Sequence, residues 1–275
     1  MNPEKLYFKN NGYVIYRNVF NSDEILNFRH LVKSSLNKDL ESNRASFSQE
    51  GKKKVYYTNG DMITKPISKL FFNNKIINIA KEVLGEKPCY FGEGNYQIGV
   101  GDRGFHRDSV EEIIDGKSTR IFGHGPDWDE NYKLIRVGVY LQDHDEYSGG
   151  IKFQKGSNKL PYKKGKSVLA DTKAGDVVVW DLRTFHSGNS IRLKGFPNFP
   201  LPRIVENLLP PFLAIPEPKL RNSAFMVFGA DNMHLHRHIE KHYKVKFESH
   251  IRESEYPDDI IAKCEEVGVK FIKLN

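Results

Sequence analysis

Cysteine is scarce in this sequence. The 275-residue chain contains two cysteines, Cys89 and Cys264, and neither belongs to a CxxC pair. Two isolated thiols cannot form a disulfide framework, and nothing around them marks either one as a nucleophile. We therefore expect two free cysteines in a chain that works in a reducing compartment.

Long apolar runs are also missing. No stretch approaches the roughly 20 apolar residues of a membrane-spanning helix, and Met1–Lys5 leads into a polar segment without the apolar region of a signal peptide. With 39% hydrophobic and 12% aromatic residues, the chain still has enough apolar material for a core. Because the sequence shows neither a repeat nor a linker, we expect residues 1–275 to form a single domain. Because it shows neither a signal peptide nor a membrane span, we expect this domain to be cytoplasmic and to have no membrane partner.

The excess of positive charge is small and scattered. The formal net charge is +7, which is compatible with nucleic acid or an anionic small ligand as a partner. The densest basic runs, Lys52–Lys54 and Lys163–Lys166, lie in stretches with glycine or serine, which indicates solvated loops. We therefore expect no nucleic-acid partner, and the alternative is a positively charged entrance for an acidic substrate.

Residues 1–89 are predicted to be mainly helical. Asn21–Glu24 has the pattern of a capping box, and apolar residues then recur at helical spacing as far as Leu36. A second amphipathic helix is predicted from Pro66 to Leu84, and Gly85 would end it. The polar stretch 38–54 is predicted to be a loop.

After residue 89 the pattern changes to short segments rich in Val, Ile, Tyr and Phe, separated by glycine. The predicted strands are 94–98, 134–142, 150–154, 167–170, 176–180, 186–193 and 224–229. Strands at this spacing with no helices between them predict an antiparallel sandwich or barrel over residues 90–230. The seven prolines within 195–220 predict an irregular insertion, and residues 231–275 are predicted to form a helix-rich tail.

The candidate metal ligands are His106, Asp108 and His186. Residues i and i+2 of a strand face the same side, so an HxD tripeptide directs an imidazole and a carboxylate to one place. His186 follows the apolar run Val177–Trp180, at a Ser/Gly/Asn turn where a strand ends. Two histidines and one carboxylate hold Fe(II) on one face and leave its other positions open. The sequence therefore predicts a non-haem iron site.

Two further patterns compete with this site, and both have a simpler interpretation. Gly99–Gly104 fits GxGxxG, but it leads into His106 without any βαβ alternation, so we interpret it as a flexible lead-in and not as a dinucleotide site. A second histidine cluster consists of His234, His236, His238 and His242. Without a nearby acidic motif, this cluster indicates an exposed polar helix more than a zinc site.

Tyr96 and Gln97 are neighbours on the predicted strand 94–98, so their side chains point to opposite faces. Tyr96 is predicted to pack in the core, and Gln97 is predicted to contact substrate or co-substrate.

Several stretches resemble one family. Phe8–Ile15 followed by Phe20–Glu24 is similar to the opening strand and helix of the phytanoyl-CoA dioxygenase-like family of Fe(II)/2-oxoglutarate-dependent oxygenases. Gly149–Asn158 resembles the family's G-x-l-x-x-x-P-G-S-H turn, with lysine and asparagine in place of proline and histidine. Ala174–Asp181 and Thr184–Asn189 resemble its Gly-Asp strand and the turn that carries its distal histidine. The resemblance covers most of the chain.

This resemblance implies a mainly β fold, a double-stranded β-helix (jelly roll, cupin-like) flanked by helices. It also implies Fe(II) as cofactor, 2-oxoglutarate and O2 as co-substrates, and an arginine that binds the far carboxylate of 2-oxoglutarate through two parallel hydrogen bonds. Arg221, at the start of a strand-like run, is favoured for this role over Arg192, and Gln97 is a further candidate. Related halogenases replace the acidic ligand with a small residue, so Asp108 argues against halogenation.

The activity implied is hydroxylation of a C–H bond, with conversion of 2-oxoglutarate and O2 to succinate and CO2. Desaturation or cyclisation would use the same residues. The polar loops and basic balance favour a small polar or anionic metabolite as substrate. The alternative is a cupin-like sensor or binding protein that keeps the metal but performs no turnover.

Overall fold

The computed structural model describes most of the chain. The described residues are 2–42, 46–50, 53–59, 65–99, 104–108, 112–114, 117–119, 127–159, 165–218, 221–246 and 258–274. Lys52, Lys163 and Lys164 lie outside these ranges, as do residues 100–103 of the glycine-rich stretch. Cys89 and Cys264 are free, as predicted, and both are buried. No described helix has both the length and the hydropathy needed to cross a bilayer.

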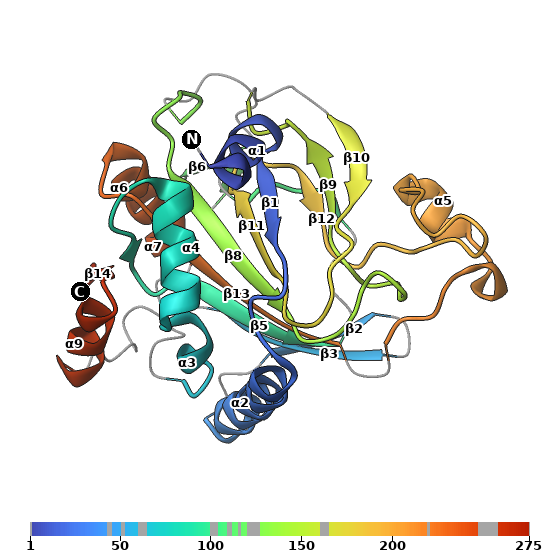
Figure 1. Cartoon of the computed structure of the whole chain (residues 1–275), viewed down its shortest axis with the longest axis horizontal. Helices are drawn as coiled ribbons and strands as arrows, with labels where there is room; N and C mark the ends of the chain where they lie inside the picture. Colours follow the sequence, from blue (N-terminus) through green and yellow to red (C-terminus); the bar gives the residue numbers. More distant parts are fainter. Residues whose placement is uncertain are drawn as a thin grey trace.

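A large, mostly antiparallel sheet forms the centre of the molecule (Figure 1). Counted over the described residues it has nine strands, and its main path runs β1 (Tyr13–Tyr16), β11 (Val177–Asp181), β8 (Leu134–Tyr140), β13 (Asn222–Gly229), β5 (Gly94–Ile98), β3 (Lys53–Asn59) and β2 (Ser46–Glu50). β4 (Cys89–Tyr90) pairs with the end of β13, and β14 (Lys270–Phe271) pairs in parallel with β4.

A smaller sheet lies against one face of the large one. Its strands are β10 (Lys166–Leu169), β9 (Lys152–Lys155) and β12 (His186–Ser187), in that order. A separate hairpin pairs β6 (Glu112–Ile114) with β7 (Lys117–Thr119). The small sheet matters for the site because β12 begins with His186, which the sequence singles out as a metal ligand.

The alternation of side chains along β11 separates two apolar layers. Val177 and Val179 belong to the layer beneath the helices, whereas Val178 and Trp180 belong to the layer between the two sheets. In this inner layer the Trp180 ring lies 5.9 Å from that of Phe153 on β9. All five β11 residues are buried, which explains why this strand reads as a continuous apolar run instead of an alternating one.

The other regular elements of the described residues are helices, and one of them, Asn74–Leu84, lies on the outer face of the large sheet. They are α1 (Pro3–Asn11), α2 (Ser22–Glu41), α3 (Ser68–Phe71), α4 (Asn74–Leu84), α5 (Arg203–Leu208), the 3-10 turn η1 (Pro211–Leu213), α6 (Met233–His238), the π-helix η2 (Ile239–Tyr243), α7 (Lys244–Lys246) and α9 (Asp258–Glu266). The predicted capping box of α2 is present, because Asn21 and Glu24 each accept a hydrogen bond from the other's backbone N–H. Gly85 ends α4 in the left-handed conformation, as predicted (φ 79°).

Three local predictions for the first 89 residues are wrong. The helix expected from Pro66 to Leu84 is two helices. Asn73 lies between them in an extended conformation, and its side chain caps α4 by accepting a hydrogen bond from Ile76 N–H. The loop expected over 38–54 instead contains the end of α2, all of β2 and the first two residues of β3. Of the run from Phe8 to Tyr16, which was expected to be strand-like throughout, Phe8–Asn11 belong to α1, with Asn2 as its cap, and only Tyr13–Tyr16 form β1.

The C-terminal helices close one end of the space between the sheets. Leu235 of α6, with Ile239 and Tyr243 of η2, packs against Leu134 of β8 and Val227 of β13. Figure 1 shows α6 and α7 at this end, on the opposite side of the molecule from α5. This packing places His234, His238 and His242 next to the interior of the fold.

Candidate active site

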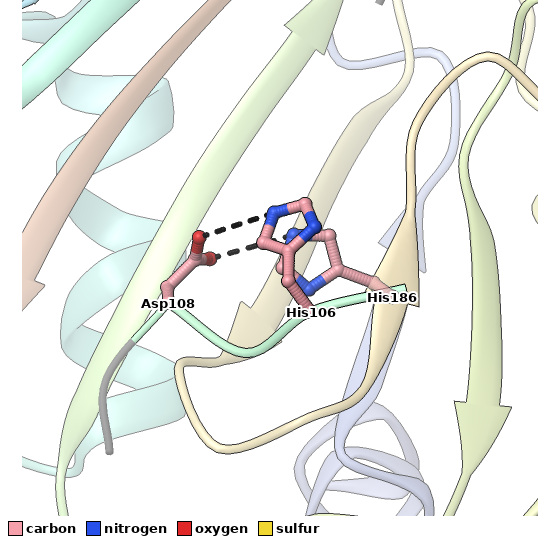
Figure 2. A group of neighbouring side chains, drawn as sticks. All are labelled: His106, Asp108 and His186. Carbon is pink, nitrogen blue, oxygen red and sulfur yellow. Dashed lines mark ion pairs between the residues drawn. The ribbon is translucent and has the colours of Figure 1, made fainter. Parts of the chain in front are cut away.

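His106, Asp108 and His186 converge in the space between the two sheets (Figure 2). Asp108 Oδ2 lies 3.6 Å from His186 Nε2, and Asp108 Oδ1 lies 3.9 Å from His106 Nε2. One potential ligand atom from each residue lies within 4.8 Å of the other two. The chain therefore brings together the three side chains predicted from the sequence.

A single bridge holds the two histidines side by side. His106 N–H donates to His186 O at 2.9 Å and His186 N–H donates to His106 O at 3.0 Å, which makes an isolated antiparallel bridge. The strand expected around His106 is therefore reduced to one bridged residue. Asp108 still faces the same side because its N–H donates to Leu182 O, while Arg107 turns away and lies over the Phe185 ring.

Both imidazoles have the tautomer that a metal ligand needs. His106 Nδ1 lies 2.8 Å from Gly104 O and His186 Nδ1 lies 3.0 Å from Thr184 O. A carbonyl oxygen can only accept, so each Nδ1 carries the hydrogen and each neutral ring presents the Nε2 lone pair. Burial lowers the pKa of His186 to about 4, although the Asp108 charge opposes this shift. The donor set of this site fits a divalent transition metal.

Asp108 is a buried carboxylate that remains charged. Burial alone would raise its pKa, but the positive charge of Arg136 and the hydrogen bond from Trp180 hold the pKa below its ordinary value. Its two oxygens are fixed from opposite directions. Arg136 Nη1 donates to Oδ1 at 3.0 Å, and Trp180 Nε1 donates to Oδ2 at 2.9 Å.

Arg136 connects this carboxylate to the C-terminal helix. Its Nη2 donates to Glu93 Oε1 at 3.1 Å, and Glu93 Oε2 accepts from His238 Nε2 of α6 at 2.7 Å. Burial would raise the pKa of Glu93, yet the positive charges of His238 and Arg136 lower it to about 2. The His242 ring stacks on His238 with centroids 5.0 Å apart.

The histidine cluster is therefore not an exposed polar helix, as its sequence was interpreted. His234, His238 and His242 are buried, and His236 is exposed. The π-helix η2 follows His238 and carries His242. Helical spacing identifies a shared face, but the partner of His238 is Glu93, and no local motif marks that residue.

A cavity of about 340 Å³ opens onto the three candidate ligands. Arg221 and Gln97 line this cavity, together with Tyr140 and His242. The Arg221 guanidinium lies 5.7 Å from the Tyr140 ring centroid, and its Nε donates to Gly149 O at 2.8 Å. Burial raises the pKa of Tyr140 to about 12, although the charge of Arg221 opposes the shift, so the phenol keeps its proton.

Arg192, the rival candidate, lies elsewhere. It is buried, but it does not line the cavity. Its Nη1 donates to Pro197 O at 2.8 Å and its Nη2 pairs with Asp171. Tyr96 is fully buried, as predicted, and its hydroxyl donates to Asp39 at 2.7 Å.

Solved structures of similar fold include an α-ketoglutarate-dependent non-haem enzyme and two proteins with 2-oxoglutarate bound. The epimerase SnoN from nogalamycin biosynthesis, described as non-haem and α-ketoglutarate-dependent, superposes with a TM-score of 0.56 at 16% identity, over 82% of this chain and 80% of that one. HygX from Streptomyces hygroscopicus, with nickel and 2-oxoglutarate bound, gives 0.53 at 14% identity, over 84% and 88%. EctD from S. alaskensis, with 2-oxoglutarate and 5-hydroxyectoine, gives 0.55 at 15% identity, over 84% and 76%. These likenesses confirm the predicted jelly-roll fold.

Sequence comparison assigns the family. No curated protein matches the sequence significantly. The family model described as phytanoyl-CoA dioxygenase matches residues 8–192, about two thirds of the chain. The matched region contains His106, Asp108 and His186 and ends before Arg221. The chain belongs to the phytanoyl-CoA dioxygenase family.

Proposed function

We propose that this protein is an Fe(II)- and 2-oxoglutarate-dependent oxygenase that hydroxylates a small polar or anionic metabolite. In this proposal His106, Asp108 and His186 bind the iron, and Arg221 binds the far carboxylate of 2-oxoglutarate. The observation that carries the proposal is the cavity, in which both Nε2 atoms face one buried carboxylate and a guanidinium lines the same space.

Bound iron would supply the oxidation, in which 2-oxoglutarate and O2 give succinate and CO2 while a substrate C–H bond is oxidised. The chain's own groups hold the participants in place. Asp108 stays ionised at neutral pH and His186 stays neutral, so both can act as ligands without first changing protonation state. Arg221 is always charged and offers a planar fork that fits a carboxylate.

The cavity lining supports a polar substrate. Besides the candidate ligands, its side chains include Glu93, Asn95, Gln97 and His242. A site of about 340 Å³ lies at the small end of the usual range for small-molecule pockets. The solved relatives also bind polar small molecules, since one HygX structure contains hygromycin B and the EctD structure contains 5-hydroxyectoine.

The reaction outcome is the finer part of the proposal. Structures of similar fold include an epimerase and a carbocyclase, SnoN and SnoK. We propose hydroxylation because it is the default outcome of the class and Asp108 supplies the third protein ligand that halogenases lack. Product analysis by mass spectrometry tests this, because hydroxylation adds one oxygen atom to the substrate whereas epimerisation and cyclisation do not.

Succinate formation tests the activity itself. Purified protein with Fe(II), ascorbate and 2-oxoglutarate is expected to form succinate, even without substrate, at a slow uncoupled rate. His186→Ala removes one ligand and is expected to abolish this activity, whereas His236→Ala, on the exposed face of α6, is expected to leave it unchanged. Equal succinate formation by His186→Ala and the wild type would exclude the proposed site.

Titration calorimetry separates the enzyme from a binding protein without turnover. Under anaerobic conditions the protein loaded with Mn(II) is expected to bind 2-oxoglutarate, and the apoprotein is expected to bind it much more weakly. A sensor of the cupin type would bind the metal without binding 2-oxoglutarate. Metal binding with no detectable 2-oxoglutarate binding would therefore favour the sensor.

A further inference from the structure

The helix α5 in the proline-rich insertion is amphipathic in the reverse sense. Its polar residue Glu206 points inward, where Oε1 lies 2.8 Å from Lys152 Nζ, and both side chains are 1% exposed. Its apolar residues Ile204 and Leu208 point outward and are 74% and 76% exposed. A surface helix normally buries its apolar stripe, so the outer face of α5 lacks the cover that such a stripe requires.

The neighbouring turns of the insertion extend this apolar face. The exposed large hydrophobic residues of the segment are Phe196, Phe199, Ile204, Val205, Leu208, Phe212 and Leu213, and we call them the insertion face. Figure 1 shows α5 and the loops around it projecting from the small-sheet side of the molecule. The other exposed large hydrophobics of the described residues are spread over α1, α2, α6 and α7, with Tyr147 in a loop.

The base of the insertion holds this face outward. Lys152 Nζ also donates to Leu201 O at 2.7 Å, and Glu206 Oε1 accepts from Ile191 N–H at 3.1 Å. Arg192 donates to Pro197 O at 2.8 Å, which fixes the first turn. Hydrogen bonds to its members support a buried ion pair, and here Lys152 Nζ has two acceptors, Glu206 Oε1 and Leu201 O, and Glu206 Oε1 also accepts from the backbone. The insertion face is therefore presented by an ordered support.

The size and charge of the insertion face indicate its partner. Aromatic rings bury 150–250 Å² each, so three phenylalanines at roughly two-thirds exposure offer about 400 Å². With the four aliphatic residues the face approaches the roughly 800 Å² that each partner contributes to a stable interface. Residues 195–213 contain one basic and one acidic residue, Arg203 and Glu206. Such a neutral face lacks the basic cluster that attracts anionic membranes, and it carries little charge to oppose its own copy across a two-fold axis.

We propose that two copies of this chain associate through the insertion face about a two-fold axis. The dimer follows from the apolar face and its support, and it does not depend on the proposed activity. The wild-type chain is expected to sediment as a dimer, with a dissociation constant that Ile204→Glu combined with Leu208→Glu raises by about 100-fold, the effect of losing a central interface contact. Leu26→Glu, at a 55% exposed position of α2, is the matched control and is expected to leave the dimer intact.

Analytical ultracentrifugation over a wide concentration range measures these outcomes, and circular dichroism confirms that each variant is folded. If the glutamate variant does not fold, Phe212→Ser in η1 provides the same test at another point of the face. A monomeric wild type at every concentration would overturn the proposal, as would a dimer that the glutamate variant and Phe212→Ser leave unchanged. Flotation of the wild type with phosphatidylcholine vesicles would also overturn it, because the face would then bind lipid.

The contacts from His238 to Asp108 carry a second, independent inference. Three successive hydrogen bonds, of 2.7, 3.1 and 3.0 Å, connect His238 to Glu93, Glu93 to Arg136 and Arg136 to Asp108. All four side chains are buried or nearly so. Because Arg136 bridges two carboxylates, its guanidinium is fixed on one side by Glu93 and can orient Asp108 on the other.

We infer that Glu93 and His238 are positioning residues for the metal ligand Asp108. This rests on the proposed iron site, in which partners of a ligating carboxylate typically change metal affinity by 10–100-fold. His238→Leu removes the donor to Glu93 and is expected to weaken Mn(II) binding about 10-fold and to lower kcat, with little change in the KM for 2-oxoglutarate. His238→Gln keeps an N–H donor and is expected to recover most of the affinity.

His236→Leu on the exposed face of the same helix is the matched control. Its imidazole pairs with Asp231 at the surface, so the variant is expected to bind Mn(II) like the wild type. If the wild type itself does not bind Mn(II), the proposed iron site fails. If the wild type binds and His238→Leu binds equally well, or loses only thermal stability, the positioning role alone is overturned.

Discussion

Arg221 and Arg192 are both buried, and they differ in what their guanidinium groups contact. Arg221 lines the cavity of the candidate ligands, whereas Arg192 donates to Pro197 O of the insertion and pairs with Asp171, which follows β10. Arg221→Gln is expected to weaken 2-oxoglutarate binding to the Mn(II)-loaded protein by about 100-fold, because two charge-assisted hydrogen bonds are lost. Titration calorimetry measures this change.

Arg192→Gln is the control for that prediction. It is expected to leave 2-oxoglutarate affinity within about twofold while lowering the unfolding temperature, because charged hydrogen bonds in a buried setting contribute roughly 1.5–3 kcal/mol each. The reverse pattern, with 2-oxoglutarate binding lost in Arg192→Gln and kept in Arg221→Gln, would assign the anchor to Arg192.

Single residues of the site differ in how far the sequence identifies them. His106, Asp108 and His186 can be found because metal chemistry requires those residue types at that spacing. Glu93 and His238 are 145 positions apart and Glu93 and Arg136 are 43 apart, so no local pattern connects them. Their role depends on burial, which makes an ordinary charged residue require a partner. Which charged residues become buried depends on contacts between distant parts of the chain, and the local sequence does not show these contacts.

At the scale of elements, the Lys152–Glu206 pair joins β9 to α5. Lys152→Met leaves Glu206 buried without its cation, and this is expected to destabilise the protein by roughly 3–5 kcal/mol. Combining Lys152→Met with Glu206→Leu removes both charges and is expected to recover most of the loss. Urea unfolding of the two single variants and the double variant measures the coupling.

The exposed pair between Lys75 and Glu24 is the matched control. Its side chains are 47% and 31% exposed, so Lys75→Met is expected to cost about 0–1 kcal/mol. A loss of stability in Lys152→Met no larger than that in Lys75→Met would show that the buried pair does not hold α5 in place.

A helix or strand whose apolar residues follow one periodicity can be predicted from the sequence. An element whose apolar residues face solvent, or which is flanked by prolines, cannot. The capping box of α2 and the apolar run of β11 identify themselves through local chemistry. The helix α5 does not, because its apolar side faces solvent and prolines surround it. The break between α3 and α4 arises because Asn73 caps α4 with its side chain and does not continue α3.

At the scale of the whole molecule, the spacing of the strands predicts an antiparallel β architecture, and the family resemblance specifies the jelly roll. The packing of α6 and η2 against the end of the barrel cannot be predicted in the same way. Their sequence reads as a polar histidine-rich helix, and only the contacts with β8 and β13 turn that histidine face inward. Long-range packing thus decides which of several surface-like segments completes the interior.

The fold is expected to lose stability on acidification when no metal is bound. Burial lowers the pKa of His186 from 6.5 to about 4 and that of His144 from 6.5 to about 3. Because both folded-state values lie below the unfolded value, the unfolded chain binds more protons once the pH falls below about 6.5. The stabilisation that comes from keeping these two rings neutral is therefore complete above about pH 6.5. It decreases as the pH falls, until the pH reaches the folded-state pKa of each ring.

The expected slope is about 1.4 kcal/mol per pH unit for each of these histidines between roughly pH 6 and pH 4. His144 is the clearer probe, because its Nε2 accepts from the Gln142 amide at 2.7 Å and cannot do so when protonated. Urea unfolding of the chelator-treated protein at several pH values measures the slope. His144→Gln removes that titrating ring and is expected to lower the slope by about half. A free energy of unfolding that stays constant from pH 7 to pH 5 would show that neither ring is held neutral by the fold.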